Sequence, residues 1–171
     1  VVGMANNNDL RFIKTERLIE DTYIELKKKK NAPVKVCDLC NAALINKTTF
    51  YSHYESIGSL HEHMCDKTVT EILATCPHVG DAFTNTQAFV CSLIEALQQN
   101  EIIIKTLYGD DSTMLVNNVE KGLLSIYLQG DELPENEMQI IFAIGGASRL
   151  LIKNQKKDRV RITISLLQKL F

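Results

Sequence analysis

The chain has 171 residues, a net charge of −2, 45% hydrophobic residues and 23% charged residues. This composition is typical of an ordinary soluble globular protein and excludes an intrinsically disordered one. The longest apolar run, near residues 140–147, is far too short to cross a bilayer, so no membrane partner is expected.

Few breakers and many helix formers favour an all-α fold of about nine helices. The chain has three prolines, eight glycines and no Trp, with many Leu, Ile, Lys and Glu residues, and no strand alternation persists. The opening residues VVGMANNND lack the basic and apolar regions of a signal peptide, so a cytoplasmic protein is expected.

The first predicted helix covers residues 10–30 and ends at the Asn-Ala-Pro sequence that follows. Its final lysines are typical of a solvated helix end that complements the helix dipole, although they add positive charge. Helical spacing predicts a buried stripe made of Ile19, Tyr23 and Leu26. Leu18 and Thr22 are expected to lie beside this stripe.

Two short helices joined by a tight turn are predicted between Val36 and Tyr54. Apolar residues from Val36 to Ala43 recur at three- and four-residue spacing, which places them on one face of the first helix. Asn46 is a good N-cap for the second helix. Within that helix, Phe50 and Tyr54 lie four residues apart and are expected to face the first helix.

The other side of this second helix carries hydrogen-bonding side chains that need no core. They form three rows: Lys47 with Tyr51, Thr48 with Ser52, and Thr49 with His53. A short braced helix that presents such side chains suits the DNA major groove. From spacing alone, a solvated helical hairpin remains the alternative.

This order of residues resembles the DNA-binding domain of the TetR/AcrR family of bacterial transcriptional regulators. That family's pattern runs Asp-Ile-Ala, Ala-Gly-Val-Ser and Lys-Gly-Thr-Leu-Tyr-x-His-Phe. The corresponding segments here are 38–40 (DLC), 43–46 (ALIN) and 47–54 (KTTFYSHY), within a likeness that covers roughly Thr15 to Met64. Three departures are Leu44 at a turn position that prefers Gly, Thr48 at a small-residue position, and Ile57 where a phosphate-binding Lys is typical.

The resemblance implies a helix-turn-helix domain over residues 9–60 and a helical regulatory and dimerisation domain over residues 61–171. It implies double-stranded DNA as partner, with a palindromic operator bound by a homodimer. Phosphate positioning is assigned to Lys35, Thr49, Tyr51 and His53, and base readout to Lys47, Thr48 and Ser52. Cys37 lies near the start of the first short helix, where the family also contacts DNA.

Charge supports this division only modestly. Residues 10–60 carry nine Lys or Arg and six Asp or Glu, for +3, whereas residues 66–171 carry ten and thirteen, for −3. The positive half is therefore the half expected to meet DNA.

Five cysteines and a group of nearby histidines suggest a redox or metal site as a second kind of site. Cys37 and Cys40 form a CxxC, but it lies within a predicted helix and has no second copy. His61 and Cys65 lie four residues apart on one helical face, but His63 points elsewhere, and Pro77 ends the helix after Cys76 and before His78. We therefore expect free thiols, no metal and no cofactor.

The later helices are predicted from pattern alone. They cover residues 56–76, 85–99 (capped by Thr84 or Asn85), 101–108, 113–128 (capped by Ser112), 134–153 (opened by Pro134) and 158–171. In the family, an apolar ligand pocket lies among such helices. The residues expected to line it are Phe89, Leu107, Tyr108, Met114, Tyr127 and Phe142, although plain core packing would give the same pattern.

Gly145 and Gly146 lie within a predicted helix, where each lowers helix stability by about 1 kcal/mol relative to Ala. Close approach of another helix would explain them. The resemblance implies that the last two helices pair with their copies in a second subunit, through Gly145, Gly146, Arg149, Ile162 and Leu166. Close packing within one chain is the alternative.

The sequence therefore predicts a repressor that a small hydrophobic ligand releases from DNA. Switching by a protein partner is one alternative, and a thiol or metal sensor is a second. An enzyme is not expected, because no paired carboxylates, nucleophile–base pair or phosphate-binding Gly loop is apparent.

Overall fold

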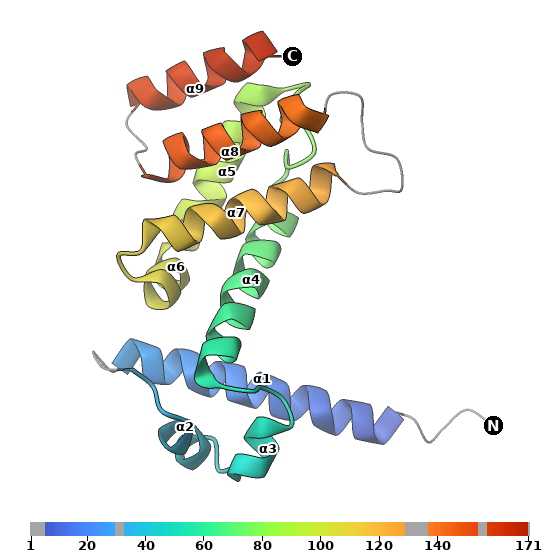
Figure 1. Cartoon of the computed structure of the whole chain (residues 1–171), viewed down its shortest axis with the longest axis vertical. Helices are drawn as coiled ribbons and strands as arrows, with labels where there is room; N and C mark the ends of the chain where they lie inside the picture. Colours follow the sequence, from blue (N-terminus) through green and yellow to red (C-terminus); the bar gives the residue numbers. More distant parts are fainter. Residues whose placement is uncertain (1–5, 30–32, 129–136, 154–156, 171) are drawn as a thin grey trace, which may run out of the picture. The chain divides into compact units, whose positions relative to one another are not determined.

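The computed structural model describes residues 6–29, 33–128, 137–153 and 157–170. Within these ranges every regular element is a helix and no strand occurs, which confirms the all-α prediction. The chain divides into two compact units, Val1–Met64 and Cys65–Phe171, and the helices are labelled in Figure 1.

The first unit contains α1 (Asn6–Lys29), α2 (Val36–Ala42), α3 (Lys47–Tyr51) and the beginning of α4 (Ile57–Thr75). Helix α2 packs against both α1 and α3. The apolar face predicted for the two short helices forms the core of this unit. Its most deeply buried side chains are Ile19, Tyr23, Leu39, Phe50 and Leu60.

The buried stripe predicted for α1 is confirmed at Ile19 and Tyr23, whereas Leu26 is half-buried. Leu18 is 44% exposed, whereas Glu20, a charged residue, is only 5% exposed. Glu20 lies three residues before Tyr23 and one residue after Ile19, so helical geometry turns it towards the core. Its burial is possible because polar side chains surround its carboxylate, as described below.

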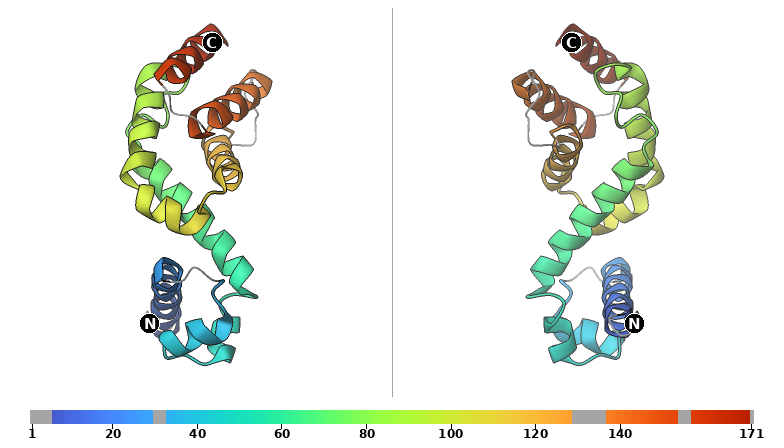
Figure 2. Two further views of the ribbon diagram at one scale, coloured as in Figure 1. Left: turned by 90° about the vertical axis from the view of Figure 1, so that its left-hand side faces the viewer. Right: turned by 90° about the vertical axis from the view of Figure 1, so that its right-hand side faces the viewer.

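The second unit contains the rest of α4 and five further helices: α5 (Thr86–Gln99), α6 (Glu101–Tyr108), α7 (Ser112–Tyr127), α8 (Glu137–Lys153) and α9 (Lys157–Leu170). Helix α8 lies between α7 and α9, and the views in Figure 2 show α5 beside α9. Apolar side chains of α5, α7 and α8 fill the space among them, including Val90, Leu93, Val116, Val119 and Ile144.

The helix starts in this unit depend on side-chain caps. The Asn85 side chain accepts from the Ala88 amide at 3.4 Å, as predicted. The predicted Ser112 cap was wrong, because the Asp111 carboxylate accepts from the amides of Thr113 and Met114. A carboxylate also interacts favourably with the positive end of the helix dipole. The predicted start at Pro134 lies outside the described residues.

Candidate nucleic-acid interface

The turn between α2 and α3 has the geometry of a Schellman motif. The Ile45 amide donates to the Cys40 carbonyl at 3.0 Å, and the Leu44 amide donates to the Asn41 carbonyl at 3.4 Å. Leu44 has a φ of 54° and is 91% exposed. The chain therefore places a leucine in the left-handed conformation that normally favours glycine.

Asn46 starts α3 as the sequence predicted. Its side-chain oxygen accepts from the Thr49 amide at 2.7 Å, which satisfies one of the free amides at the helix start. Phe50 is fully buried and Tyr54 is 7% exposed. The short helix α3 is thus fixed at its start by a cap and along its inner face by two aromatic rings.

A buried polar cluster holds α3 against its neighbours within the first unit. The Tyr54 hydroxyl donates to Glu20 Oε1 at 3.3 Å, and His63 Nε2 lies 3.0 Å from the same oxygen. Burial, reinforced by the negative charge of Glu20, raises the pKa of Tyr54. Glu20, which sequence reasoning missed, therefore links α1 to the end of α3 and the beginning of α4.

The opposite face of α3 is open. Lys47, Thr48, Tyr51 and Ser52 are exposed, with 55% of Tyr51 accessible. The Ser52 hydroxyl donates to the Thr49 carbonyl at 2.7 Å, so its remaining capacity towards a ligand is as an acceptor. The structure thus brings these four predicted DNA-binding side chains together on one surface, and half-buried Thr49 lies beside them.

His53 differs from the other predicted contacts. Its ring is half-buried and stacks on Phe12 of α1, with the ring centroids 3.9 Å apart. Its Nδ1 is buried and has no hydrogen-bond partner among the described residues. Only the other ring nitrogen could then serve a phosphate, and Phe12, which is 46% exposed, shares this corner of the surface.

The start of α2 contributes two more predicted residues. Lys35 is its exposed N-cap and makes no side-chain cap bond. Cys37 is exposed, with its thiol 3.9 Å from Asp38 Oδ1, whereas Cys40 is buried and its pKa is raised by desolvation. The two cysteines of the CxxC therefore have different surroundings.

Helix α4 begins with a reciprocal pair of serines. The Ser59 amide donates to Ser56 Oγ and the Ser56 amide donates to Ser59 Oγ, both at 3.0 Å. This arrangement resembles a capping box in which Ser replaces the usual Glu. Ile57, at the first helical position, is half-buried and carries no charge for a phosphate.

The predicted ligand residues do not converge on one cavity. Phe142 is 71% exposed, which places it on the surface of α8. Tyr108 is buried, and its hydroxyl donates to the Cys65 carbonyl at 3.1 Å and accepts from Asn118. Among the six, only Phe89 lines the cavity of about 10 Å³ in the second unit. Such a volume holds at most about one water molecule.

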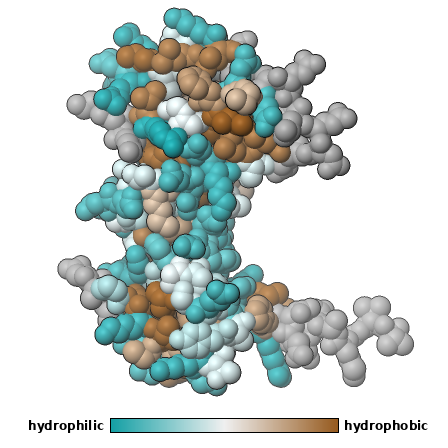
Figure 3. Space-filling view, viewed as in Figure 1, coloured by the Kyte–Doolittle hydropathy of each residue, from teal (hydrophilic) through white to brown (hydrophobic). Residues whose placement is uncertain are grey.

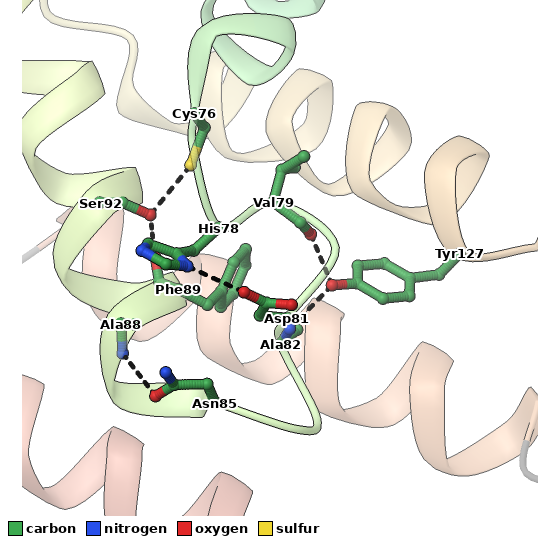
Figure 4. Close-up of polar contacts among 10 residues, drawn as sticks. All are labelled: Cys76, His78, Val79, Asp81, Ala82, Asn85, Ala88, Phe89, Ser92 and Tyr127. Atoms are coloured by element: carbon green, nitrogen blue, oxygen red, sulfur yellow. Dashed lines mark hydrogen bonds and ion pairs between the residues drawn. The ribbon is translucent and has the colours of Figure 1, made fainter.

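Tyr127 does not line that cavity but forms hydrogen bonds to the loop between α4 and α5. Its hydroxyl donates to the Val79 carbonyl at 2.5 Å and accepts from the Ala82 amide at 2.9 Å (Figure 4). In the same loop, His78 Nδ1 lies 2.8 Å from Asp81 Oδ2. Ala82 is buried and lines the small cavity, so this loop forms part of its wall.

The two glycines of α8 have different surroundings. A Cβ at Gly145 would lie 3.1 Å from the Glu120 carboxylate, whereas a Cβ at Gly146 would meet nothing within 4 Å. Arg149 Nη1 contacts Glu120 at 2.6 Å and the Gly145 carbonyl at 3.1 Å. Close packing within the chain therefore explains Gly145 but does not explain Gly146.

An exposed apolar surface extends over α8 and α9, where hydrophobic side chains gather in Figure 3. Among its large side chains, Met138 is 77% exposed, Ile162 53% and Leu166 50%, in addition to Phe142. Exposed apolar side chains that gather on one surface are typical of a contact with another molecule.

No group of three or more His, Cys, Asp or Glu residues within the described ranges could hold a metal ion. His61 lies 3.1 Å from the Tyr23 hydroxyl, and burial lowers its pKa.

In the described part of the chain, no helix is both long and apolar enough to cross a membrane.

Comparison with known proteins gives a likeness in structure but none in sequence. No sequence-family profile matches the chain, and neither does any curated protein. The chain is similar to the solved structure of a TetR transcriptional regulator from Streptococcus agalactiae 2603V, with a TM-score of 0.54 and 20% sequence identity. The superposition covers 95% of this chain and 98% of that chain. At this identity the likeness establishes the fold alone, which is a TetR-like all-α fold.

Proposed function

We propose that the chain is a transcriptional regulator that binds double-stranded DNA through α2 and α3. The observation that carries this proposal is the two-sided character of α3. Phe50 and Tyr54 are buried, while Lys47, Thr48, Tyr51 and Ser52 face outward. A supported short helix with an exposed row of hydrogen-bonding groups is what major-groove recognition needs.

In this proposal, Lys47, Thr48 and Ser52 read base edges, since they lie on the outer face of α3. Lys35, Thr49, Tyr51 and His53 position phosphates, and Cys37 lies beside Lys35 at the start of α2. Phosphate contacts set register, whereas base contacts give specificity. Lys27, Lys28 and Lys29 add attraction at longer range, but two of them already pair with Glu25.

We further propose a homodimer formed through the exposed surface of α8 and α9. Gly146, Ile162 and Leu166 belong to this surface, whereas Arg149 and Gly145 are engaged by Glu120 within the chain. A two-fold dimer would present two copies of α3 to a palindromic operator, with half-sites about 34–36 Å apart.

The proposed regulator is a repressor that an effector releases from its operator. The small volume of the cavity among α5, α7 and α8 favours an effector that binds at the surface of the second unit, either a small molecule or a protein partner. A ligand that enters the core would have to enlarge a cavity of about 10 Å³. An effector acts only by binding the two conformations with different affinities.

Paired variants of α3 test the DNA-binding proposal. A palindromic duplex is first selected from random DNA by the wild-type protein, and affinities are then measured by fluorescence anisotropy. If Lys47 reads a base, Lys47→Ala should weaken binding by about 1–3 kcal/mol and relax specificity at one position. If Lys47 contacts only phosphate, the loss should be equal on all sequences and the salt slope should fall by about one.

Tyr51→Phe removes only a hydroxyl and should weaken binding by about 0.5–1.5 kcal/mol. Lys105→Ala is the matched control, because Lys105 is an exposed lysine on α6, outside the first unit. Thermal stability should change little in all three variants. A large loss of stability in the α3 variants, with DNA affinity intact, would show that this face is not the binding surface.

A further inference from the structure

A groove of about 480 Å³ lies between α5 and α9 in the second unit. Its volume is within the range of sites that bind small molecules, roughly 300–1,000 Å³. None of the residues assigned above to DNA, to a core ligand or to the dimer surface lines it. The groove therefore needs an explanation of its own.

One side of α9 lines this groove, and that side packs neither into the core nor into the proposed dimer contact. Lys157, Arg161, Ile164 and Gln168 recur at three- and four-residue spacing, so they share one side of the helix. Thr163 and Leu167 point into the core, and Ile162 and Leu166 are exposed elsewhere. The groove can therefore be occupied while the other two faces keep their contacts.

Two side chains that line the groove, Lys157 and Arg161, are positively charged, and none of the lining residues that the structure describes is negatively charged. Lys157 and Arg161 form no ion pair with any residue that the structure describes. Glu95 and Asp158, the carboxylates nearest in sequence, are not among the lining residues. Lys157 is also the first residue of α9, where the helix dipole adds positive potential. An anionic group would be favoured here over a neutral or cationic one.

The rest of the lining is mainly apolar at its base and polar at its rim. Ile94, Val160 and Ile164 are half-buried, whereas Gln87, Ser165 and Gln168 are exposed. The half-buried aliphatic surface would be covered by a short hydrocarbon chain, with a gain proportional to the area removed from water. One ligand that satisfies both parts carries a negative head and an aliphatic tail.

We propose that the groove between α5 and α9 binds a small amphipathic anion, a carboxylate or phosphate head group with a short aliphatic chain. Arg161 and Lys157 hold the head, and Ile94, Val160 and Ile164 contact the chain. This site lies entirely within the second unit and does not depend on DNA binding, so the two proposals can fail separately.

Titration calorimetry of the full chain with octanoate, octyl phosphate, octanol and octylamine tests the ligand class. Octanoate or octyl phosphate should bind with one site per chain, and octanol and octylamine should bind at least tenfold more weakly. Comparison of the two anions identifies the preferred head group. Raising the salt concentration should weaken binding of the anions, because the head-group contacts are partly exposed.

Two double variants of equal charge locate the site. Lys157→Gln with Arg161→Gln should weaken octanoate binding by about tenfold, since two partly exposed charge contacts are lost. Arg159→Gln with Lys169→Gln removes two exposed charges from other faces of α9 and should leave binding unchanged. Equal losses in both double variants would mean general charge attraction and would overturn the proposal.

Methyl NMR gives a readout that is independent of affinity. The isoleucine methyls of Ile94 and Ile164 should shift on addition of octanoate, whereas that of Ile102, exposed on α6, should not. No binding of either anion, or shifts confined to other isoleucines, would refute the site. Binding of anionic lipid vesicles or of an acidic peptide without binding of either small anion would likewise overturn it, in favour of a macromolecular partner.

Discussion

Leu44 offers a sharp test of the local structure at the helix-turn-helix. It occupies the left-handed position of the Schellman motif with a φ of 54°, where a Cβ normally conflicts with the following carbonyl oxygen. Its side chain is 91% exposed, so almost no packing depends on it. Replacing Leu44 with Gly therefore isolates the backbone strain.

The magnitude follows from two opposing terms. A residue with a Cβ in the left-handed region costs roughly 1–2 kcal/mol, and Leu44→Gly removes that penalty. Glycine also gives the unfolded chain more conformational freedom, which offsets about 0.4–1 kcal/mol of the gain. We expect a net increase of about 0.5–1 kcal/mol in the free energy of unfolding.

Urea unfolding followed by far-UV circular dichroism measures this change. The midpoint should rise with an unchanged m value, because the surface exposed on unfolding is nearly the same. Leu44→Ala is the matched control: it removes the exposed side chain but keeps the Cβ, so the strain remains. If Leu44→Gly is no more stable than Leu44→Ala, the strain assigned to this turn does not exist.

Two further predictions concern the second unit. Gly146→Leu should lower the molar mass seen by light scattering if α8 forms the dimer contact. The free energy of helix formation should improve by about 0.5–1 kcal/mol, because a glycine is lost from the helix. A wild-type protein that is monomeric at micromolar concentration would contradict the dimer. Burial raises the pKa of Tyr108 above its ordinary value near 10, so its contribution is complete below that pH and is lost as the pH rises through the folded-state pKa. Tyr108→Phe should therefore make the decline of stability above about pH 10 shallower, as measured by urea unfolding at several pH values, and an unchanged slope would contradict this assignment.

The parts of the fold set by local chemistry could be predicted from the sequence. Asn46 caps α3, and Phe50 and Tyr54 are buried, because a cap and a four-residue spacing act within one or two turns. The sequence placed Leu44 at a turn position that prefers Gly, but it did not give the backbone conformation there. The paired hydrogen bonds of the turn, which depend on where both helices end, resolve that question.

The parts set by contacts between distant segments could not be predicted. Glu20 is buried because His63 and Tyr54, about forty residues later, surround its carboxylate. The six predicted ligand residues share an apolar or aromatic character, but only packing decides which way each turns, and Phe142 turns outward. Gly145 and Gly146 are adjacent in sequence, yet one faces Glu120 and the other faces open space.

The small volume of the cavity in the second unit constrains how an effector could act. A ligand larger than one water molecule can occupy the small cavity only if lining residues move, and Ala82 and Phe83 of the loop between α4 and α5 are among them. Moving that loop breaks both hydrogen bonds of Tyr127, at about 1 kcal/mol each, and exposes buried apolar surface to water. A ligand in the groove between α5 and α9 meets no such barrier, because that groove is already open. At equal intrinsic affinity, the surface site would therefore be occupied at lower ligand concentration than the core site.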